Sequence, residues 1–442
     1  MQSNLELLMP AGDMEKMKYA FAYGADAVYV GAPMFSLRAR TNAFNMDTLK
    51  EAVQYAHNLG KKIYFTANIY AHNIKIKPFL AHFKKMYEMG PDAFIMADPG
   101  LIHLVKKEFP DAVIHLSVQQ NNVNWAQVEF WKSVGVERVI LARELSMDEM
   151  KEIHEKNPEV ELEAFVHGAI CISYSGRCLL SNYMAHRDAN QGTCAQSCRW
   201  QYKVLREENK NPIKVENNIG ERGEYGGYKP LKDYYYLEEQ ERPGEFLPID
   251  EDEYGTHIMN SRDMCAIAYM KEIIDAGIIS FKVEGRNKTI NYVATVARAY
   301  RKAIDLASQG KELPMEELMS ELFSVANRGY IPGFFVGDLK DNAQYYEKNG
   351  GFQTKKFMGK VVSYDEKTGL ARIVVKNRFE KGDILEIITP DETWTETVGD
   401  IIKYKGEEKI VTDVAHGGGV DVYIKLKKNP GEFSILRADI KK

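Results

Sequence analysis

The sequence predicts an α/β fold: a TIM (β/α)8 barrel with an insertion after its seventh strand, followed by a small all-β barrel. Amphipathic helical segments alternate with short apolar strands through the first 285 residues. From residue 357 the pattern changes to alternating strands separated by turn residues. A glycine follows five of the helical segments, as is typical of a left-handed helix end: Gly24, Gly60, Gly90, Gly135 and Gly277.

Eight apolar segments are the expected strands of the first barrel. They span residues 5–10, 27–31, 62–68, 93–98, 113–119, 138–143, 162–168 and 279–285. Near-continuous apolar strands that alternate with helices predict a parallel sheet covered on both faces. Eight such units in about 300 residues fit a closed barrel better than an open sheet. No G-x-G-x-x-G follows the first strand and no G-x-x-x-x-G-K-[ST] occurs, so neither nucleotide-binding fold is favoured.

The pattern divides the chain into two domains and a linker. We expect a barrel domain at 1–337 with an insertion at 201–258, a linker at 338–353 and a β-barrel domain at 354–442. The insertion is charged and rich in Tyr and Gly, which suits either a functional lid or partner surface, or a solvated hairpin extension. We expect the seventh barrel helix to start near residue 263 and the eighth to span 288–307.

Composition is that of an ordinary globular protein, with 45% hydrophobic and 27% charged residues among 442. No apolar run approaches the ~20 residues that a membrane span needs. The N-terminal residues show no basic-then-apolar signal peptide, so we expect a cytoplasmic protein with reduced thiols. A net charge of −5 argues against a protein that coats nucleic acid. The stretch 354–442 is weakly positive, with 17 Lys and Arg against 15 Asp and Glu.

Cysteine is concentrated in one part of the chain. Four of the five cysteines lie within residues 161–200 and the fifth follows the insertion: Cys171, Cys178, Cys194, Cys198 and Cys265. They stand among Gly, Ser, Arg and Gln, which indicates a site that uses sulfur more than it indicates small apolar packing residues. All five fall after the expected seventh strand, so we expect them over the C-terminal barrel mouth, where TIM-barrel active sites lie.

Thiolates in this number suit an iron–sulfur cluster or zinc. The spacing, C-x6-C and then C-x15-C-x3-C, is more dispersed than in zinc ribbons and fits a cluster somewhat better, with zinc as the alternative. A third reading is a cysteine nucleophile with His167 as its base, but it leaves the other thiols unexplained. The hydrolase motifs H-E-x-x-H and G-x-S-x-G are missing.

Polar residues at the other expected strand ends would join the cysteines at the barrel mouth. They are Asn68, Asp98, Gln119, Gln120, Arg143, Glu144, Lys282, Glu284 and Arg286. For each one alone, a polar layer that closes the top of the barrel is an equally good explanation.

Several segments resemble the peptidase U32 (collagenase-like protease) family. The core H-G-A-x-C-x-x-Y-S-G-x-C-x-x-S runs from His167 to Ser181, and RDANQGTCAQSCRW, MNSRDMC and FKVEGR also match. Within the family, the chain is most similar to the prephenate-dependent tRNA uridine hydroxylation proteins. That resemblance implies oxygen insertion at C5 of the wobble uridine, a requirement for prephenate, and a C-terminal barrel similar to the second domain of translation factors. Sister groups that hydroxylate an rRNA cytidine or a quinone precursor carry an iron–sulfur cluster.

The resemblance also implies roles for individual residues. The ligands of a [4Fe–4S] cluster would be Cys171, Cys178, Cys194 and Cys265, with Cys198 as an alternate fourth ligand. Prephenate is a dicarboxylate, and its candidate binding residues, chosen by position and chemistry, are Arg143, Arg177, Lys282, Glu284 and Arg286. His167 and Glu163 are candidates for proton transfer, although His167 could equally brace its loop.

The expected partners are tRNA and, by analogy with relatives that act in pairs, a second copy or a related family member. Two other functions stay open at this point. One is a peptidase that uses a cysteine or an exogenous metal, as the family name suggests. The other is an RNA-binding or assembly subunit whose metal site is structural.

Overall fold

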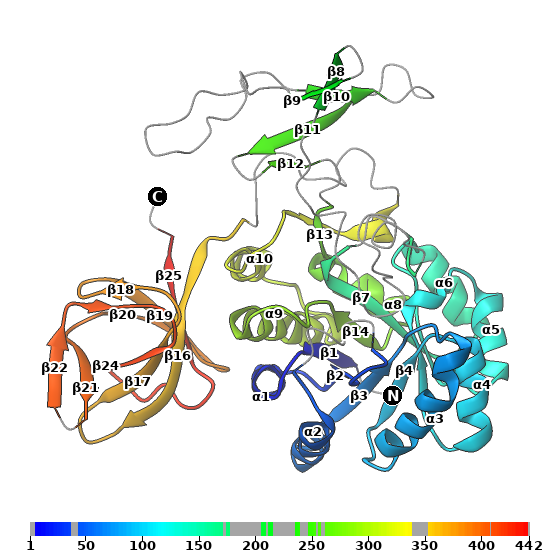
Figure 1. Ribbon diagram of the computed structural model, residues 1–442, viewed down its shortest axis with the longest axis horizontal. Helices are drawn as coiled ribbons and strands as arrows, with labels where there is room; N and C mark the ends of the chain where they lie inside the picture. Colours follow the sequence, from blue (N-terminus) through cyan, green and yellow to red (C-terminus); the bar gives the residue numbers. More distant parts are fainter. Residues whose placement is uncertain are drawn as a thin grey trace.

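The computed structural model describes residues 5–36, 43–170, 174–176, 261–337, 352–406 and 408–440, and five short strands within the insertion. Eight parallel strands close into a barrel, because the last of them, β14, pairs with both β1 and β7. They are β1 (Glu6–Ala11), β2 (Ala27–Gly31), β3 (Lys62–Ala67), β4 (Ala93–Met96), β5 (Ile114–Leu116), β6 (Arg138–Ile140), β7 (Glu161–Ala169) and β14 (Ser280–Val283). The predicted TIM barrel is therefore confirmed (Figure 1).

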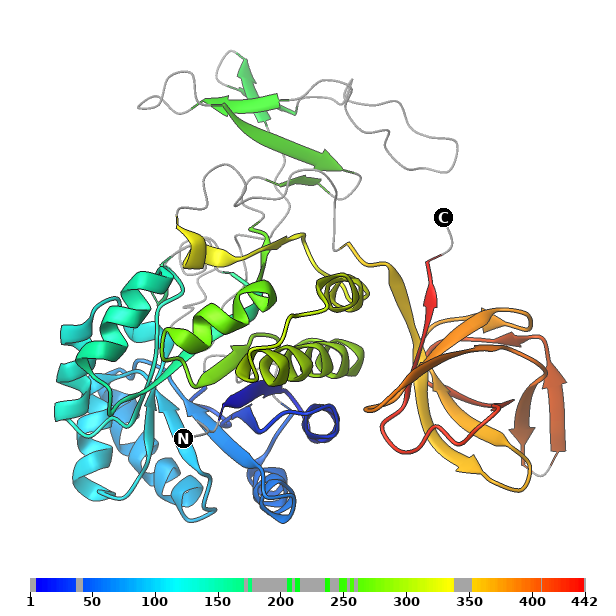
Figure 2. The ribbon, with the colours of Figure 1, turned by 180° about the vertical axis from the view of Figure 1, so that it is seen from behind.

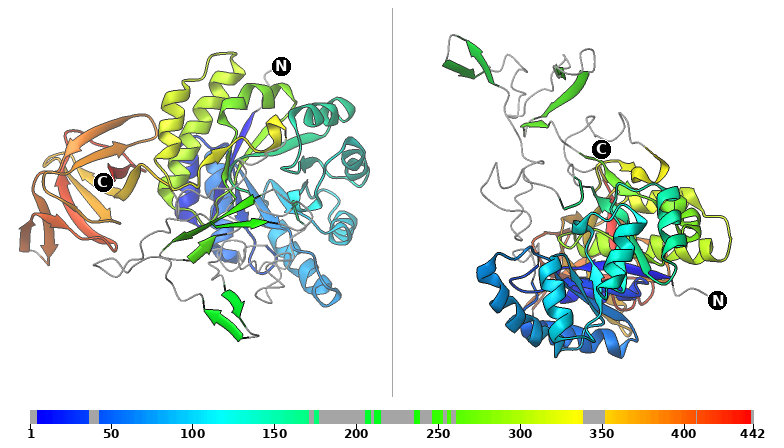
Figure 3. Two further views of the ribbon diagram at one scale, coloured as in Figure 1. Left: turned by 90° about the horizontal axis from the view of Figure 1, so that it is seen from above. Right: turned by 90° about the vertical axis from the view of Figure 1, so that its right-hand side faces the viewer.

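Helices lie around the outside of the barrel (Figures 1 and 3). They are α1 (Met14–Ala22), α2 (Met46–Asn58), α3 (Asn73–Tyr87), α4 (Pro99–Glu108), α5 (Trp125–Ser133), α6 (Met147–Lys156), α8 (Met270–Asp275), α9 (Ile290–Ser308) and α10 (Met315–Phe323). Side chains of Asp13, Asn45 and Ser146 cap the first turns of α1, α2 and α6. The five glycines predicted to end helices all have positive φ angles. Within the described residues, no helix is long and apolar enough to span a membrane.

The stretch near residue 263 differs from the expectation, because it is a strand and not the start of a helix. β13 (Asp263–Cys265) pairs antiparallel with the end of β7, and β15 (Tyr330–Ile331) pairs with β13. The pairing of β7 with β14 shifts register between Lys282 and Val283 and ends at His167, whereas β7 itself continues to Ala169. Its backbone groups there are paired by β13, and α8 begins only at Met270.

The C-terminal part of the chain is an antiparallel sheet with its own hydrophobic core. Its eight strands are β16 (Lys355–Asp365), β17 (Leu370–Val375), β19 (Ile384–Ile388), β20 (Thr393–Thr397), β21 (Ile401–Lys405), β22 (Glu408–Thr412), β24 (Val420–Lys425) and β25 (Ile435–Asp439). A two-stranded sheet of β18 (Phe379–Glu380) and β23 (Val414–Ala415) adds to it. The curved sheet has the shape of a small barrel in Figure 2, in line with the predicted all-β fold.

The insertion contains two small antiparallel sheets. Their strands are β8 (Leu205–Glu208), β9 (Asn211–Lys214), β10 (Tyr235–Glu238), β11 (Phe246–Asp252) and β12 (Gly255–His257).

Polar contacts join the two barrels. The hydroxyl of Tyr23, the residue that follows α1, lies 3.0 Å from the carbonyl oxygens of both Ile388 and Phe433. Arg298 of α9 donates to the Thr389 carbonyl oxygen at 3.0 Å, and Arg437 donates to the Ser324 hydroxyl at 2.5 Å. The C-terminal barrel therefore contacts the α1–α9–α10 side of the TIM barrel.

Candidate active site at the mouth of the barrel

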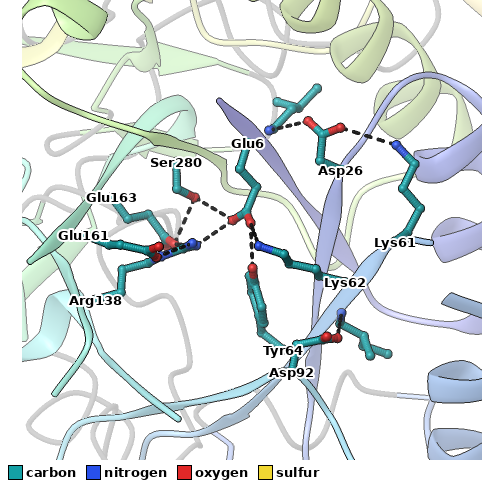
Figure 4. A network of polar contacts seen from close by, with 12 residues as sticks. Glu6, Asp26, Lys61, Lys62, Tyr64, Asp92, Arg138, Glu161, Glu163 and Ser280 are labelled. Carbon is teal, nitrogen blue, oxygen red and sulfur yellow. Dashed lines mark hydrogen bonds and ion pairs between the residues drawn. The ribbon is translucent and has the colours of Figure 1, made fainter. Parts of the chain in front are cut away.

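Charged side chains fill part of the barrel interior, where apolar residues are usual (Figure 4). Arg138 Nη1 donates to Glu6 Oε1 at 2.5 Å and to Glu163 Oε2 at 3.2 Å. Lys282 Nζ donates to Glu163 Oε1 at 2.7 Å. All four groups are buried, and two cations balance two carboxylates. Removal of any single charge would therefore leave an uncompensated partner in the barrel interior.

Burial and neighbouring charges set the pKa values in this network. Burial alone would raise the pKa of Glu6, but Arg138, together with the Tyr64 hydroxyl, which donates to Glu6 at 2.6 Å, brings that pKa below its usual value. Burial lowers the pKa of Lys282, and the Glu163 carboxylate only partly offsets this effect. Glu163 is therefore held between two cations. This arrangement suits a structural role for Glu163 as much as a role in proton transfer.

Three of the predicted substrate-binding cations lie in a row with two aromatic rings, which we call the cation–ring row: Arg143, Phe165, Lys282, Tyr29 and Arg286. The Arg143 guanidinium is 3.9 Å from the centre of the Phe165 ring. Lys282 Nζ is 5.4 Å from the Phe165 ring and 4.7 Å from the Tyr29 ring. The Arg286 guanidinium is 5.8 Å from the Tyr29 ring. The rings stabilise these cations through their negative faces. Lys282 and Arg286 are buried and Arg143 is partly exposed, so three cations lie in one part of the barrel, one of them paired with Glu163.

Hydrogen bonds fix the two ends of the cation–ring row. Arg286 Nη1 donates to the hydroxyls of Ser36 and Thr66, both at 3.0 Å. Arg143 Nη1 donates to the Ala169 carbonyl oxygen at 2.9 Å. Glu284 lies near the row, with its Oε2 3.4 Å from the Tyr29 hydroxyl. Such fixed cations suit a ligand with two or more negative groups.

The loop Tyr174–Gly176 reaches the ends of two barrel strands. The Ser175 amide donates to Glu144 Oε1 at 2.7 Å, just after β6. Gly176 has a φ of +73°, and a Cβ built on it would lie 2.1 Å from the Gln119 carbonyl oxygen after β5. Gly176 is therefore needed both for its left-handed backbone and for this close approach. In the sequence, Cys171 precedes this loop and Cys178 follows it.

His167 and Cys265 lie side by side, because β13 pairs with the end of β7 at these two residues. Both are buried, and the rings of Tyr292, Tyr300 and Tyr330 surround His167. Burial lowers the pKa of His167 to about 3 and raises the pKa of the Cys265 thiol to about 11. Reactive cysteines have lowered pKa values. A buried thiol with a raised pKa is a poor nucleophile, so Cys265 lacks the character of a catalytic cysteine.

The model of peptidase family U32 matches residues 12–345, and that of the family's C-terminal domain matches residues 353–437. The chain belongs to peptidase family U32. It is 45% identical over 434 residues to tRNA hydroxylation protein P of Escherichia coli, covering 96% of this chain and 94% of the relative. It is 44% identical over 437 residues to the Haemophilus influenzae protein of the same name, with the same two coverages.

A more distant relative also carries a hydroxylation name. The 23S rRNA 5-hydroxycytidine C2501 synthase of Escherichia coli is 32% identical over 302 residues, which cover 68% of this chain and 39% of that protein. The names of these U32 relatives therefore cover hydroxylation of both tRNA and 23S rRNA.

The cysteine cluster of this U32 chain lies mostly outside the described residues. Cys171, Arg177, Cys178, Cys194 and Cys198 fall there, so the structure neither gathers nor separates them. In the part of the chain that is described, no group of three or more Cys, His, Asp or Glu side chains is placed to hold a metal. Cys265 fits a cluster in its chemistry, because it is a buried sulfur 3.7 Å from the Tyr300 hydroxyl.

Sequence reasoning missed several members of the U32 site. Glu6, Tyr29, Arg138 and Phe165 lie at inward positions of their strands, two residues apart from other inward residues such as Leu8 and Glu163. That period of two was the available signal, since a charged residue at an inward strand position must pair with another charge inside the barrel. Tyr300 lies within the helix expected at 288–307, and a helical pattern gives no sign of the contacts of its hydroxyl.

Proposed function

We propose that this chain is a tRNA-modifying enzyme that hydroxylates C5 of the wobble uridine in a prephenate-dependent reaction. The observation that carries the proposal is the match to tRNA hydroxylation protein P across 96% of this chain and 94% of the relative. The C5 position is supported by the name of the rRNA relative, a 5-hydroxycytidine synthase, because both reactions would add oxygen at the same ring position of a pyrimidine. The tRNA substrate implies work in the cytoplasm, alone or with a second family member.

The cation–ring row supports prephenate as the small-molecule ligand. Arg143, Lys282 and Arg286 bring three positive charges together, and prephenate has two carboxylates. Arg177 is proposed to add a fourth cation. Arginine binds a carboxylate through two parallel hydrogen bonds, which fixes the orientation of the acid as well as its position. Glu284, beside Tyr29, would disfavour a carboxylate at that end and so orient an asymmetric acid.

A [4Fe–4S] cluster is the proposed cofactor, held by Cys171, Cys178, Cys194 and Cys265, with Cys198 as the alternate to Cys265. Zinc is the alternative metal. A bound cluster would supply one-electron transfer next to the barrel mouth. Cys265 contributes a buried thiol beside a hydrogen-bonding hydroxyl, which suits a ligand of this kind. Glu163 holds Lys282 and Arg138 in place, and His167 contacts the residues around Cys265.

The experiment is nucleoside mass spectrometry of tRNA from cells that lack this gene. Plasmids would return the wild-type protein, Arg286→Lys, or Lys302→Ala, an exposed control on α9. Loss of 5-hydroxyuridine-type nucleosides in the deletion strain, with recovery by wild type and Lys302→Ala, is expected. Arg286→Lys should recover less than a tenth of the wild-type level, because lysine cannot keep both hydroxyl contacts and the planar charge. Unchanged tRNA in the deletion strain would reject the function.

A further inference from the structure

The Tyr300 hydroxyl of α9 meets three groups where β7 and β13 pair. It donates to the Val166 carbonyl oxygen at 2.8 Å, and it lies 3.3 Å from His167 Nδ1 and 3.7 Å from Cys265 Sγ. Tyr300, His167 and Cys265 are all buried. A buried sulfur, a hydroxyl and an imidazole thus form one hydrogen-bonded chain where α9 meets the paired ends of β7 and β13.

The number of available protons limits how the hydrogen bonds among Cys265, Tyr300 and His167 are arranged. Tyr300 has one proton to donate, and His167 Nε2 is buried with no hydrogen-bond partner in the described part of the chain. An unpartnered buried N–H is rarer than an unpartnered acceptor, so the proton of the neutral imidazole belongs on Nδ1, where it can be donated to Tyr300. His167 therefore polarises the Tyr300 hydroxyl and makes it a better donor.

The Val166 carbonyl oxygen has a second donor, because the Ala266 amide lies 2.9 Å from it. If the Tyr300 proton turns from Val166 to the sulfur, the carbonyl keeps one hydrogen bond and is not left unpaired. A metal-bound thiolate accepts a hydrogen bond more strongly than a neutral carbonyl does. The Tyr300 hydroxyl can therefore turn toward the Cys265 sulfur when that sulfur is negatively charged, and no buried carbonyl loses its last hydrogen bond.

We propose that Tyr300 is a positioning residue that donates a hydrogen bond to the Cys265 thiolate when this sulfur binds the cluster, with His167 supporting it from behind. This inference rests on the cofactor part of the proposed function. Hydrogen bonds to cluster sulfurs favour the reduced form, because they offset its additional negative charge. Tyr300 would then raise the reduction potential of the cluster without touching either substrate.

The test compares Tyr300→Phe with Tyr330→Phe in full-length protein purified without air. Both tyrosines contact the His167 ring, but the Tyr330 hydroxyl donates to the Leu322 carbonyl oxygen at 3.0 Å and not to sulfur. The readouts are iron content, broad absorbance near ~400 nm and the midpoint potential from a redox titration followed by electron paramagnetic resonance. We expect wild-type iron content in both variants, a more negative midpoint potential in Tyr300→Phe, and the wild-type potential in Tyr330→Phe.

Equal potentials in all three proteins would overturn the inference. So would a Cys265→Ala protein that keeps wild-type iron and absorbance, since the sulfur would not be a ligand. A loss of packing alone would lower the melting temperature of a variant. It would not change the midpoint potential in Tyr300→Phe while leaving it unchanged in Tyr330→Phe. The nucleoside measurement on tRNA is independent of these readouts, so failure of the hydroxylation function and failure of the Tyr300 inference are distinguishable.

Discussion

Lys282 Nζ lies 2.7 Å from Glu163 Oε1 inside the barrel, and this pair joins two sets of charged residues. Glu163 also accepts from Arg138, which belongs to the interior charge network. Lys282 also contacts the rings of Tyr29 and Phe165, which belong to the cation–ring row. Lys282, one of the cations proposed to bind a dicarboxylate, is thus held from within the barrel. Changes in the network should therefore reach ligand binding through Lys282.

Glu163→Gln should strongly destabilise the fold. The amide keeps the size of the side chain but removes one of two buried negative charges, and a broken buried ion pair costs on the order of 3–5 kcal/mol. The matched control is Glu161→Gln, because Glu161 also pairs with Arg138 but its side chain is 49% exposed. The control should cost less than about 1 kcal/mol. Urea unfolding of the two variants measures the difference, and equal losses would contradict the assigned burial.

His115→Leu should flatten the dependence of stability on pH. His115 is fully enclosed beside Tyr64, and burial, followed by Arg138 and Lys282, lowers its pKa well below 6.5. The folded protein keeps His115 neutral while the unfolded chain takes up a proton below pH 6.5. The stability that depends on neutral His115 is therefore present above this pH and is lost as the pH falls toward the folded pKa.

The slope for this one group is at most about 1.4 kcal/mol per pH unit. Unfolding free energies measured from pH 7 to pH 5 should fall more steeply for the wild type than for His115→Leu. Parallel curves for the two proteins would show that His115 is protonated in the folded state as readily as in the unfolded chain.

The fold followed from local patterns, but the site only partly did. Helix-ending glycines such as Gly24 and inward apolar strands are encoded within a few neighbouring residues, so the eight strands and most of their helices could be located. The helix expected near residue 263 begins only at Met270. The pairing of Cys265 with His167 depends on residues 98 positions apart and on a shift in register at Lys282. The placement of Arg143, Lys282 and Arg286 in one row likewise depends on ring contacts with Phe165 and Tyr29, which no local pattern encodes.

Tyr23→Phe should weaken the contact between the two barrels. The Tyr23 hydroxyl bridges the carbonyl oxygens of Ile388 and Phe433, and the substitution leaves them without this partner. We expect a loss of about 1–2 kcal/mol in unfolding free energy and faster proteolytic cleavage between the barrels. Tyr87→Phe on α3 is the control, because it removes a hydroxyl from a barrel helix at a residue whose ring packs on Phe109 of the TIM barrel. Identical cleavage rates in the two variants would argue against a role for Tyr23 in docking.

Gly176→Ala should destabilise the protein by more than the strain of its left-handed backbone alone would. Gly176 and Gly310 have similar φ angles, +73° and +66°, so alanine strains the backbone alike at both. A Cβ at Gly310 meets nothing within 4 Å, whereas one at Gly176 would lie 2.1 Å from the Gln119 carbonyl oxygen. Gly310→Ala therefore measures the strain, at about 1 kcal/mol, and the excess in Gly176→Ala measures the clash.

The clash should also displace Ser175 from Glu144, and with it the chain that leads to Cys171 and Cys178. We expect Gly176→Ala to lose most of its bound iron and most of its tRNA hydroxylation, while Gly310→Ala keeps both. Iron analysis of anaerobically purified protein and nucleoside mass spectrometry of tRNA from complemented cells would measure the two losses. A Gly176→Ala protein with wild-type iron content would show that binding of the proposed cluster does not depend on the position of the loop Tyr174–Gly176.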